Sequence, residues 1–250
     1  MVSSSASTGP WVTTHHRGSA ATFHALEPTG EHRQAWWLDV DQPALVLGST
    51  QPELVADAQA CAAAGVQVVR RRSGGGAVLL LPGECAWLDV VVPRDDPLWH
   101  DDIGESMWWL GQVWAEALDV LGCSDVAVHR GPLQHTPWSR LVCFDGLGAG
   151  EVTINGQKAV GISQRRTRHW ARLQSSVNLA VADADRRRLA ASLFANSGLS
   201  SGTTGSSFNE VLVSLLSPPR PTAAQLRPFA VIKASSEAVR TAVSSALAQR

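Results

Sequence analysis

The sequence has few of the features that mark secreted, membrane-spanning or nucleic-acid-binding proteins. It has four cysteines without a C-x-x-C pair, and its first residues, MVSSSASTGPWVTTHHRGSA, lack the apolar segment of a secretory signal. No apolar run approaches the roughly 20 residues that cross a bilayer. The formal net charge of -1 gives no overall positive field for nucleic acid. We therefore expect a cytoplasmic protein with reduced thiols, no membrane contact and no nucleic-acid partner.

Several common motifs are also missing. The chain has no internal repeat, no heptad pattern and no zinc-ligand spacing, so we expect no metal site. Its glycines follow neither G-x-x-x-x-G-K-[ST] nor G-x-G-x-x-G, which excludes a Walker loop and a dinucleotide fingerprint. With 250 residues, 44% of them hydrophobic, the chain is long enough to bury a full core.

Apolar runs and turn signals predict an α+β fold. Residues 1–20 lack apolar periodicity, which predicts a disordered leader before a single folded domain over 21–250. Strands are predicted at 44–48, 66–71, 77–81, 86–92, 126–130, 141–144, 151–154 and 158–164, and helices after Thr50, from Asp102 to Gly122, near 185–196 and at 235–248. Three strands in succession over 66–92 favour antiparallel pairing, and Asn155-Gly156 predicts a hairpin. The sum is a largely antiparallel sheet flanked by helices.

The stretch VRRRSGGGAV, residues 69–78, is the first candidate functional segment. Glycines permit positive φ, so this turn could simply connect two strands. A hairpin rarely needs three glycines, however, and exposed N–H groups beside Arg70, Arg71 and Arg72 can form a concave site for an anion or a polarised carbonyl. The segment is thus a candidate site for a phosphate or acyl ligand.

The second candidate segment is LVCFDGLGAGEVTINGQKAVGISQRRTR, residues 141–168. It places Cys143 and Lys158 on two predicted strands joined by a hairpin, which can bring their side chains together. An ammonium near a thiol favours the thiolate, the nucleophile of acyl transfer. The alternatives are that Cys143 is a buried small hydrophobe and that Lys158 is a solvated hairpin lysine.

The two segments together resemble the lipoate–protein ligase A and octanoyltransferase family. That family has an R-R-x-S-G-G-G-A-V turn and a later G-x-K-x-x-G-x-x-Q-x-R segment, matched here by RRRSGGGAV (70–78) and GQKAVGISQRR (156–166). The resemblance implies the α+β fold of a biotin/lipoyl protein ligase catalytic domain, with Cys143 and Lys158 catalytic. It also implies a set of substrate-binding residues: Arg70, Arg71, Ser73, Gly74, Gly75, Gly76, Ala77, Gly161, Gln164 and Arg165.

Three functions are compatible with this resemblance. The Cys-Phe of VCFD is similar to the nucleophile motif of cysteine-dependent octanoyltransferases, which implies a thioester on Cys143 and no required cofactor. An ATP-dependent lipoate–protein ligase shares both motifs and would need ATP and Mg²⁺. The third possibility is a non-catalytic binder of an acyl group or a lipoyl domain. In each case the expected partner is an acyl-carrier or lipoyl-acceptor domain, and the chain is expected to be a monomer.

One position departs from the family pattern. Family members have a histidine soon after the glycine turn, which is formed here by residues 74–76, in a pattern like A-V-x-H. Leu80 occupies that position in this chain. Leucine can neither donate a hydrogen bond nor move a proton. His129 and His135 are candidates to substitute for the missing histidine, although a lone histidine in a strand or loop is more often structural or exposed.

Overall fold

The computed structural model describes residues 9–29, 31–180 and 208–250. Its larger sheet has seven strands in the order β1-β2-β6-β10-β9-β8-β7, and every neighbouring pair is antiparallel except β1 with β2. The strands are β1 (Val12–Gly18), β2 (Gln34–Val40), β6 (Cys85–Pro93), β7 (Val126–Val128), β8 (Val152–Ile154), β9 (Gln157–Arg166) and β10 (Trp170–Asn178). The expected α+β class with a largely antiparallel sheet is confirmed.

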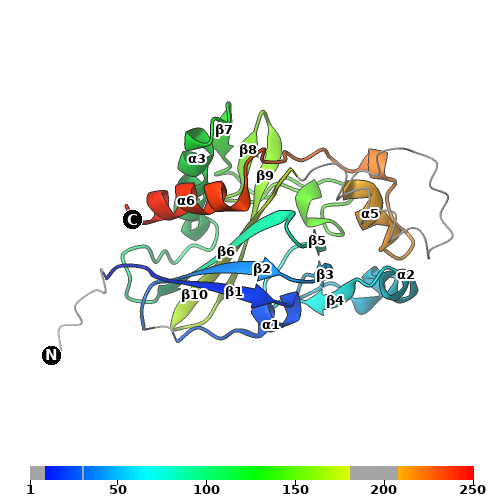
Figure 1. Cartoon of the computed structure of the whole chain (residues 1–250), viewed down its shortest axis with the longest axis horizontal. Helices are drawn as coiled ribbons and strands as arrows, with labels where there is room; N and C mark the ends of the chain where they lie inside the picture. The colour runs from blue at the N-terminus through cyan, green and yellow to red at the C-terminus, as the bar shows by residue number, and fades with distance from the viewer. Residues whose placement is uncertain (1–8, 30, 181–207) are drawn as a thin grey trace.

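A second, smaller sheet lies against one face of the first (Figure 1). It consists of β3 (Ala44–Leu47) between β4 (Gln67–Arg70), which is parallel to it, and β5 (Val78–Leu80), which is antiparallel. The prediction that the strands over 66–92 pair with one another is therefore wrong. β4 and β5 both pair with β3, and β6 lies in the larger sheet. The glycine turn between β4 and β5 thus spans the width of β3 rather than closing a hairpin.

Helices cover the two sheets on their outer sides (Figure 1). The larger sheet packs one face against α3 (Trp108–Val120) and α6 (Ser236–Leu247), and its other face against α1 (Ala20–Ala25) and the small sheet. The small sheet packs on α2 (Ala58–Ala63) and α5 (Phe208–Ser214). Short 3-10 turns occur at η1 (Glu53–Val55), η2 (Glu105–Met107), η3 (Cys143–Asp145) and η4 (Ala223–Gln225).

Strand β6 is at the centre of this arrangement because both of its faces are covered. Leu88 and Val90 belong to the core under α3 and α6, whereas Trp87 and Val91 belong to the core under α1 and the small sheet. All nine residues of the strand are buried. This explains why the run AWLDVVV shows no polar–apolar alternation.

The structure corrects three local predictions. Residues 12–18, expected in a disordered leader, form β1, whose backbone pairs with β2; residues 1–8 lie outside the described part. The helix expected after Thr50 begins later, because Asp57 rather than Thr50 caps α2 through a bond from Ala60 N–H. Residues 141–144 form no strand: Val142 makes a single bridge to Ala77, and the 3-10 turn η3 follows.

Other predictions agree with the structure. Asn155 and Gly156 have φ of 50° and 72° and connect β8 to β9 as a tight hairpin. Asp102 accepts a hydrogen bond from Glu105 N–H before η2 and α3, and Gly122, with φ of 81°, follows the helix. The helix expected near 185–196 lies outside the described residues. In ranges 9–29, 31–180 and 208–250, no helix is long and apolar enough to cross a membrane.

Candidate active site

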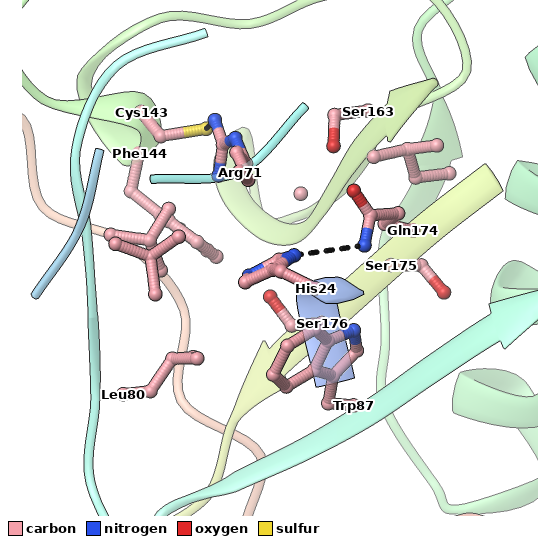
Figure 2. A pocket seen from close by; sticks show the side chains of 14 residues that line it. His24, Arg71, Leu80, Trp87, Cys143, Phe144, Ser163, Gln174, Ser175 and Ser176 are labelled. Carbon is pink, nitrogen blue, oxygen red and sulfur yellow. Dashed lines mark hydrogen bonds between the residues drawn. The ribbon is translucent and has the colours of Figure 1, made fainter. Parts of the chain in front are cut away.

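A cavity between the two sheets is lined by Cys143 and by Arg71, which precedes the glycine turn (Figure 2). Its apolar wall comes from Val46, Val78, Leu80, Trp87, Phe144 and Ile162, and its polar wall from His24, Arg71, Cys143, Ser163, Gln174, Ser175 and Ser176, with Gly161 between them. The cavity volume is about 40 Å³, so the apolar side chains must move apart to admit a long acyl chain.

The glycine turn is organised by its own arginines. Arg71 is buried and donates from Nε and Nη2 to the Gly74 carbonyl, at 3.1 and 2.8 Å, and from Nη2 to the Gly76 carbonyl at 3.0 Å. Arg70 donates to the carbonyls of Gly48 and Gln51, and Arg72 pairs with Glu27. The three arginines are therefore bonded to groups of the protein itself, whereas the sequence predicted an open site for an anion. Of the three, only Arg71 lines the cavity.

Backbone contacts fix the turn against the segment that carries Cys143. Ala77 N–H donates to Leu141 O at 2.8 Å, and Cys143 N–H donates to Ala77 O at 3.0 Å. A Cβ atom on Gly76 would lie 2.7 Å from Cys143 N and Val142 C, so this glycine is needed for the close approach. At Gly74 the same Cβ would meet nothing within 4 Å. The middle glycine, Gly75, has φ of 102°, a conformation that favours glycine.

Lys158 lies close to Cys143, but at its carbonyl rather than at its thiol. Lys158 Nζ donates to Cys143 O at 2.9 Å and to Gly146 O at 3.1 Å, and it forms a buried ion pair with Glu151 at 2.7 Å. Glu151 in turn accepts from the N–H groups of Gly148 and Ile162. The ammonium therefore holds the turn η3 from β9, whereas the donor beside the sulfur is Arg71 Nη2, 3.8 Å from Cys143 Sγ.

The remaining predicted residues divide into those at the cavity and those away from it. Gly161 lines the cavity, and a Cβ atom added to it would lie 3.3 Å from the Phe144 ring. Ser73 lies just behind the wall, where its hydroxyl contacts Ser163 Oγ at 3.0 Å and donates to Gln174 Oε1 at 2.8 Å. Gln164 instead donates to Ser106 Oγ, and Arg165 pairs with Glu27. Neither of these two lines the cavity.

The cavity wall contains both the position of the missing histidine and a different histidine. Leu80 lies in its wall, so the departure from the family pattern is at the site itself. Neither of the two proposed substitute histidines lines this cavity: His129 bonds to Pro132 O, and His135 is exposed near the outer side of Gly75. The histidine in the wall is His24, from α1, a helix that the sequence patterns did not indicate.

His24 is buried and neutral. Burial, followed by the charges of Arg172 and Arg71, lowers the pKa of His24 from 6.5 to about 3. Its ring lies 4.9 Å from the ring of Trp87. The helix that carries it is attached to the larger sheet by Arg172, which donates to the carbonyls of Phe23 and Leu26 and pairs with buried Asp89. In ranges 9–29, 31–180 and 208–250, no group of His, Cys, Asp and Glu side chains could hold a metal ion.

Comparison with known proteins places the chain in a family. Residues 21–210 match the family model of the lipoyl protein ligase A/B catalytic domain. Over 110 residues the chain is 27% identical to octanoyltransferase LipM of Clostridioides difficile, a match that covers 44% of this chain and 40% of that protein's length.

Two solved structures share the fold. A putative lipoate protein ligase from Thermoplasma acidophilum with bound lipoic acid has a TM-score of 0.64 and 16% identity, over 96% of this chain and 85% of that one. A lipoate-protein ligase A bound with ATP has a TM-score of 0.60 and 17% identity, over 96% and 84%. The resemblance to this family is confirmed, and the chain belongs to the lipoyl protein ligase A/B catalytic domain family.

Proposed function

We propose that this enzyme is a cysteine-dependent acyltransferase of lipoate metabolism. It moves an octanoyl or lipoyl group, through a thioester on Cys143, to a lysine of a lipoyl-acceptor domain. The observation that carries the proposal is that Cys143 and Arg71 line one cavity together with an apolar wall suited to an acyl chain. Burial raises the pKa of the other three thiols, to about 11 for Cys61 and about 12 for Cys85, and also that of Cys123, which disfavours their thiolate forms.

Arg71 supports a nucleophilic role for this thiol. Its guanidinium is buried, and the groups it contacts are carbonyl oxygens of the glycine turn and the sulfur of Cys143. A thiolate at that sulfur would bring a negative charge beside this cation. The arrangement assigns to Arg71 the electrostatic role that the sequence suggested for Lys158, and leaves Lys158 to position the turn that carries the nucleophile.

The reaction then has two acyl-transfer steps. The thiolate of Cys143 attacks the carbonyl carbon of a carrier thioester, and the carrier sulfur leaves with the electron pair and takes up a proton. The neutral amine of the acceptor lysine next attacks the acyl–cysteine. An amide bond forms, the amine loses a proton, and the Cys143 thiolate is released. Donors around the carbonyl oxygen stabilise the negative charge that develops in each step.

The ATP-dependent ligase is the second candidate, since both motifs are shared with that branch. In such an enzyme Lys158 would contact the acyl-adenylate, with Mg²⁺ bound alongside. In this chain Lys158 already donates to two carbonyl oxygens and a carboxylate, all of them buried or nearly so. Because the Lys158 ammonium already has these three partners, the arrangement favours the transferase, in which Lys158 needs no contact with substrate.

The experiment that tests the proposal is intact-mass spectrometry of the purified protein. We expect incubation with an octanoyl-carrier thioester to add one octanoyl group to the wild type and none to Cys143→Ala. Cys85→Ala is the matched control and should still be acylated, because Cys85 is buried away from the cavity.

Parallel reactions with octanoate, ATP and Mg²⁺ separate the remaining functions. Octanoyl-adenylate formation without any adduct on Cys143 would overturn the transferase in favour of the ligase. If neither chemistry occurs while octanoate binds, the chain is a binder. Transfer to a lipoyl-acceptor domain is followed in the same spectra as an added mass on that domain.

A further inference from the structure

The cavity wall contains one buried side-chain nitrogen without a partner, Nε2 of His24. Of the buried side-chain atoms without a hydrogen-bond partner in the described part of the chain, His24 Nε2 is the one that belongs to a residue of this cavity. A buried polar group without a partner destabilises the folded state. Such a group in a ligand cavity indicates that a bound molecule supplies the missing partner.

The protonation state of His24 follows from its neighbour Gln174. The Gln174 side chain donates from Nε2 to Asp89 Oδ2 at 2.9 Å and accepts at Oε1 from Ser73 at 2.8 Å, which fixes the orientation of its amide. The same Nε2 faces His24 Nδ1 at 3.4 Å, as Figure 2 shows. Because Gln174 can only donate there, Nδ1 is the acceptor and the ring proton is on Nε2. The free ring nitrogen is therefore a donor.

Several other polar side chains of the wall already have partners within the protein. Arg71 donates to two carbonyls of the turn, Ser163 is bonded to Ser73, and Ser175 donates to Leu88 O. The backbone N–H of Cys143 is used by Ala77 O, so it cannot serve as a donor to substrate. A saturated acyl chain joined to sulfur carries a single strong acceptor, its carbonyl oxygen.

We propose that His24 donates a hydrogen bond from Nε2 to the carbonyl oxygen of the acyl group bound at Cys143. The inference rests on the proposed acyltransferase function and names a catalytic residue for it. A neutral imidazole in this role polarises the carbonyl and stabilises the developing oxyanion without giving up its proton. Ser73 of the glycine turn takes part as a positioning residue, because it orients Gln174 and through it the imidazole.

Two substitutions at position 24 separate the donor from the ring. His24→Phe keeps an aromatic ring beside Trp87 and removes the N–H group. His24→Gln keeps an N–H donor in the cavity and removes the ring. We expect the rate of Cys143 acylation by octanoyl-carrier thioester to fall about 10²-fold in His24→Phe, the usual effect of losing one oxyanion donor. The rate in His24→Gln should stay within about tenfold of the wild type. Thermal denaturation of each variant reports whether it is folded.

The pH dependence tests whether His24 acts as a neutral group. Since the imidazole stays neutral down to low pH, the ratio of wild-type to His24→Phe acylation rates should be constant between pH 5.5 and 8. A ratio that changes with pH across this range would show that His24 titrates there, and it would overturn the proposed role of a neutral imidazole.

A binding experiment tests the hydrogen bond without requiring turnover. In protein labelled with ¹⁵N in the histidine rings, with His24 assigned by comparison with His24→Gln, we expect Nε2 to be protonated and Nδ1 unprotonated at pH 7. Octanamide, which has a carbonyl but cannot acylate the enzyme, should shift the Nε2–H resonance. A proton on Nδ1, or no shift when octanamide is bound, would refute the inference.

The two proposals fail in different ways. Acylation of wild type and His24→Phe at equal rates would refute the role of His24 and leave the transferase intact. A wild type that is never acylated, yet shows the octanamide shift at Nε2, would refute the transferase and support the donor.

Discussion

The buried neutral state of His24 predicts a specific pH dependence of stability. Its pKa is lowered to about 3 by burial and by the charges of Arg172 and Arg71. Between pH 6.5 and 3 the unfolded chain takes up a proton at this histidine and the folded chain does not. The stabilising contribution is therefore complete above pH 6.5 and is lost as the pH falls.

The magnitude follows from the ordinary pKa alone. Each pH unit below 6.5 costs about 1.4 kcal/mol, so lowering the pH to 5 removes about 2 kcal/mol of unfolding free energy through His24. The value at pH 5 depends little on the folded-state pKa, provided that it stays below about 4.

Urea unfolding at pH 7.5 and pH 5 measures this contribution. We expect the wild type to lose about 2 kcal/mol more than His24→Phe between the two pH values, because the variant has no group to protonate there. Carboxylates that titrate lower are common to both proteins and cancel in the comparison. His32→Phe, at an exposed histidine, is the control and should behave as the wild type does. Equal pH dependence of wild type and His24→Phe would refute the neutral buried imidazole.

Two further predictions concern the segments that hold Cys143. Gly76→Ala places a Cβ 2.7 Å from backbone atoms of Val142 and Cys143, so it should lower the free energy of unfolding by about 1–3 kcal/mol and remove most of the acylation rate. Gly74→Ala, whose Cβ would meet open space, should match the wild type in stability and in rate. If the two variants behaved alike, the close approach at Gly76 would be contradicted. Lys158→Met leaves the Glu151 carboxylate buried without its cation and should lower the free energy of unfolding, measured in urea, by about 3–5 kcal/mol. Adding Glu151→Gln to this variant removes the unpaired charge and should restore part of the lost stability. No recovery in the double variant would argue against the ion pair.

The sequence predicted those parts of the fold that local patterns determine. The Asn155-Gly156 hairpin and the capping by Asp102 depend on a few neighbouring residues, and both are found. Strand β1 was missed because its exposed residues show little apolar character: it is an edge strand, held by backbone pairing to β2. Segment 141–144 looked like a strand because it is apolar. Its backbone instead forms a single bridge at Val142 and then a 3-10 turn.

The site was predicted in part for the same reason. Motif spacing brought Arg71, Cys143 and Gly161 to one cavity, but it could not show that Lys158 would face the carbonyl of Cys143 rather than its sulfur. The contacts of His24 depend on residues far away in sequence, Gln174 and Arg172, and no local pattern around ATFHAL indicates them. Gln174 itself lies in β10, a strand that the sequence analysis did not select.

The connection between His24 and Gln174, which are 150 residues apart, also has a consequence for how the protein folds. Contacts of such high sequence separation form only after a large loop has closed, so the topology is one that folds slowly. During synthesis, α1 and the glycine turn leave the ribosome long before β10, and the polar wall of the cavity cannot be completed until β10 has paired with β6. A partly folded chain would thus expose a cysteine without its cavity, and activity would report on completion of the whole sheet.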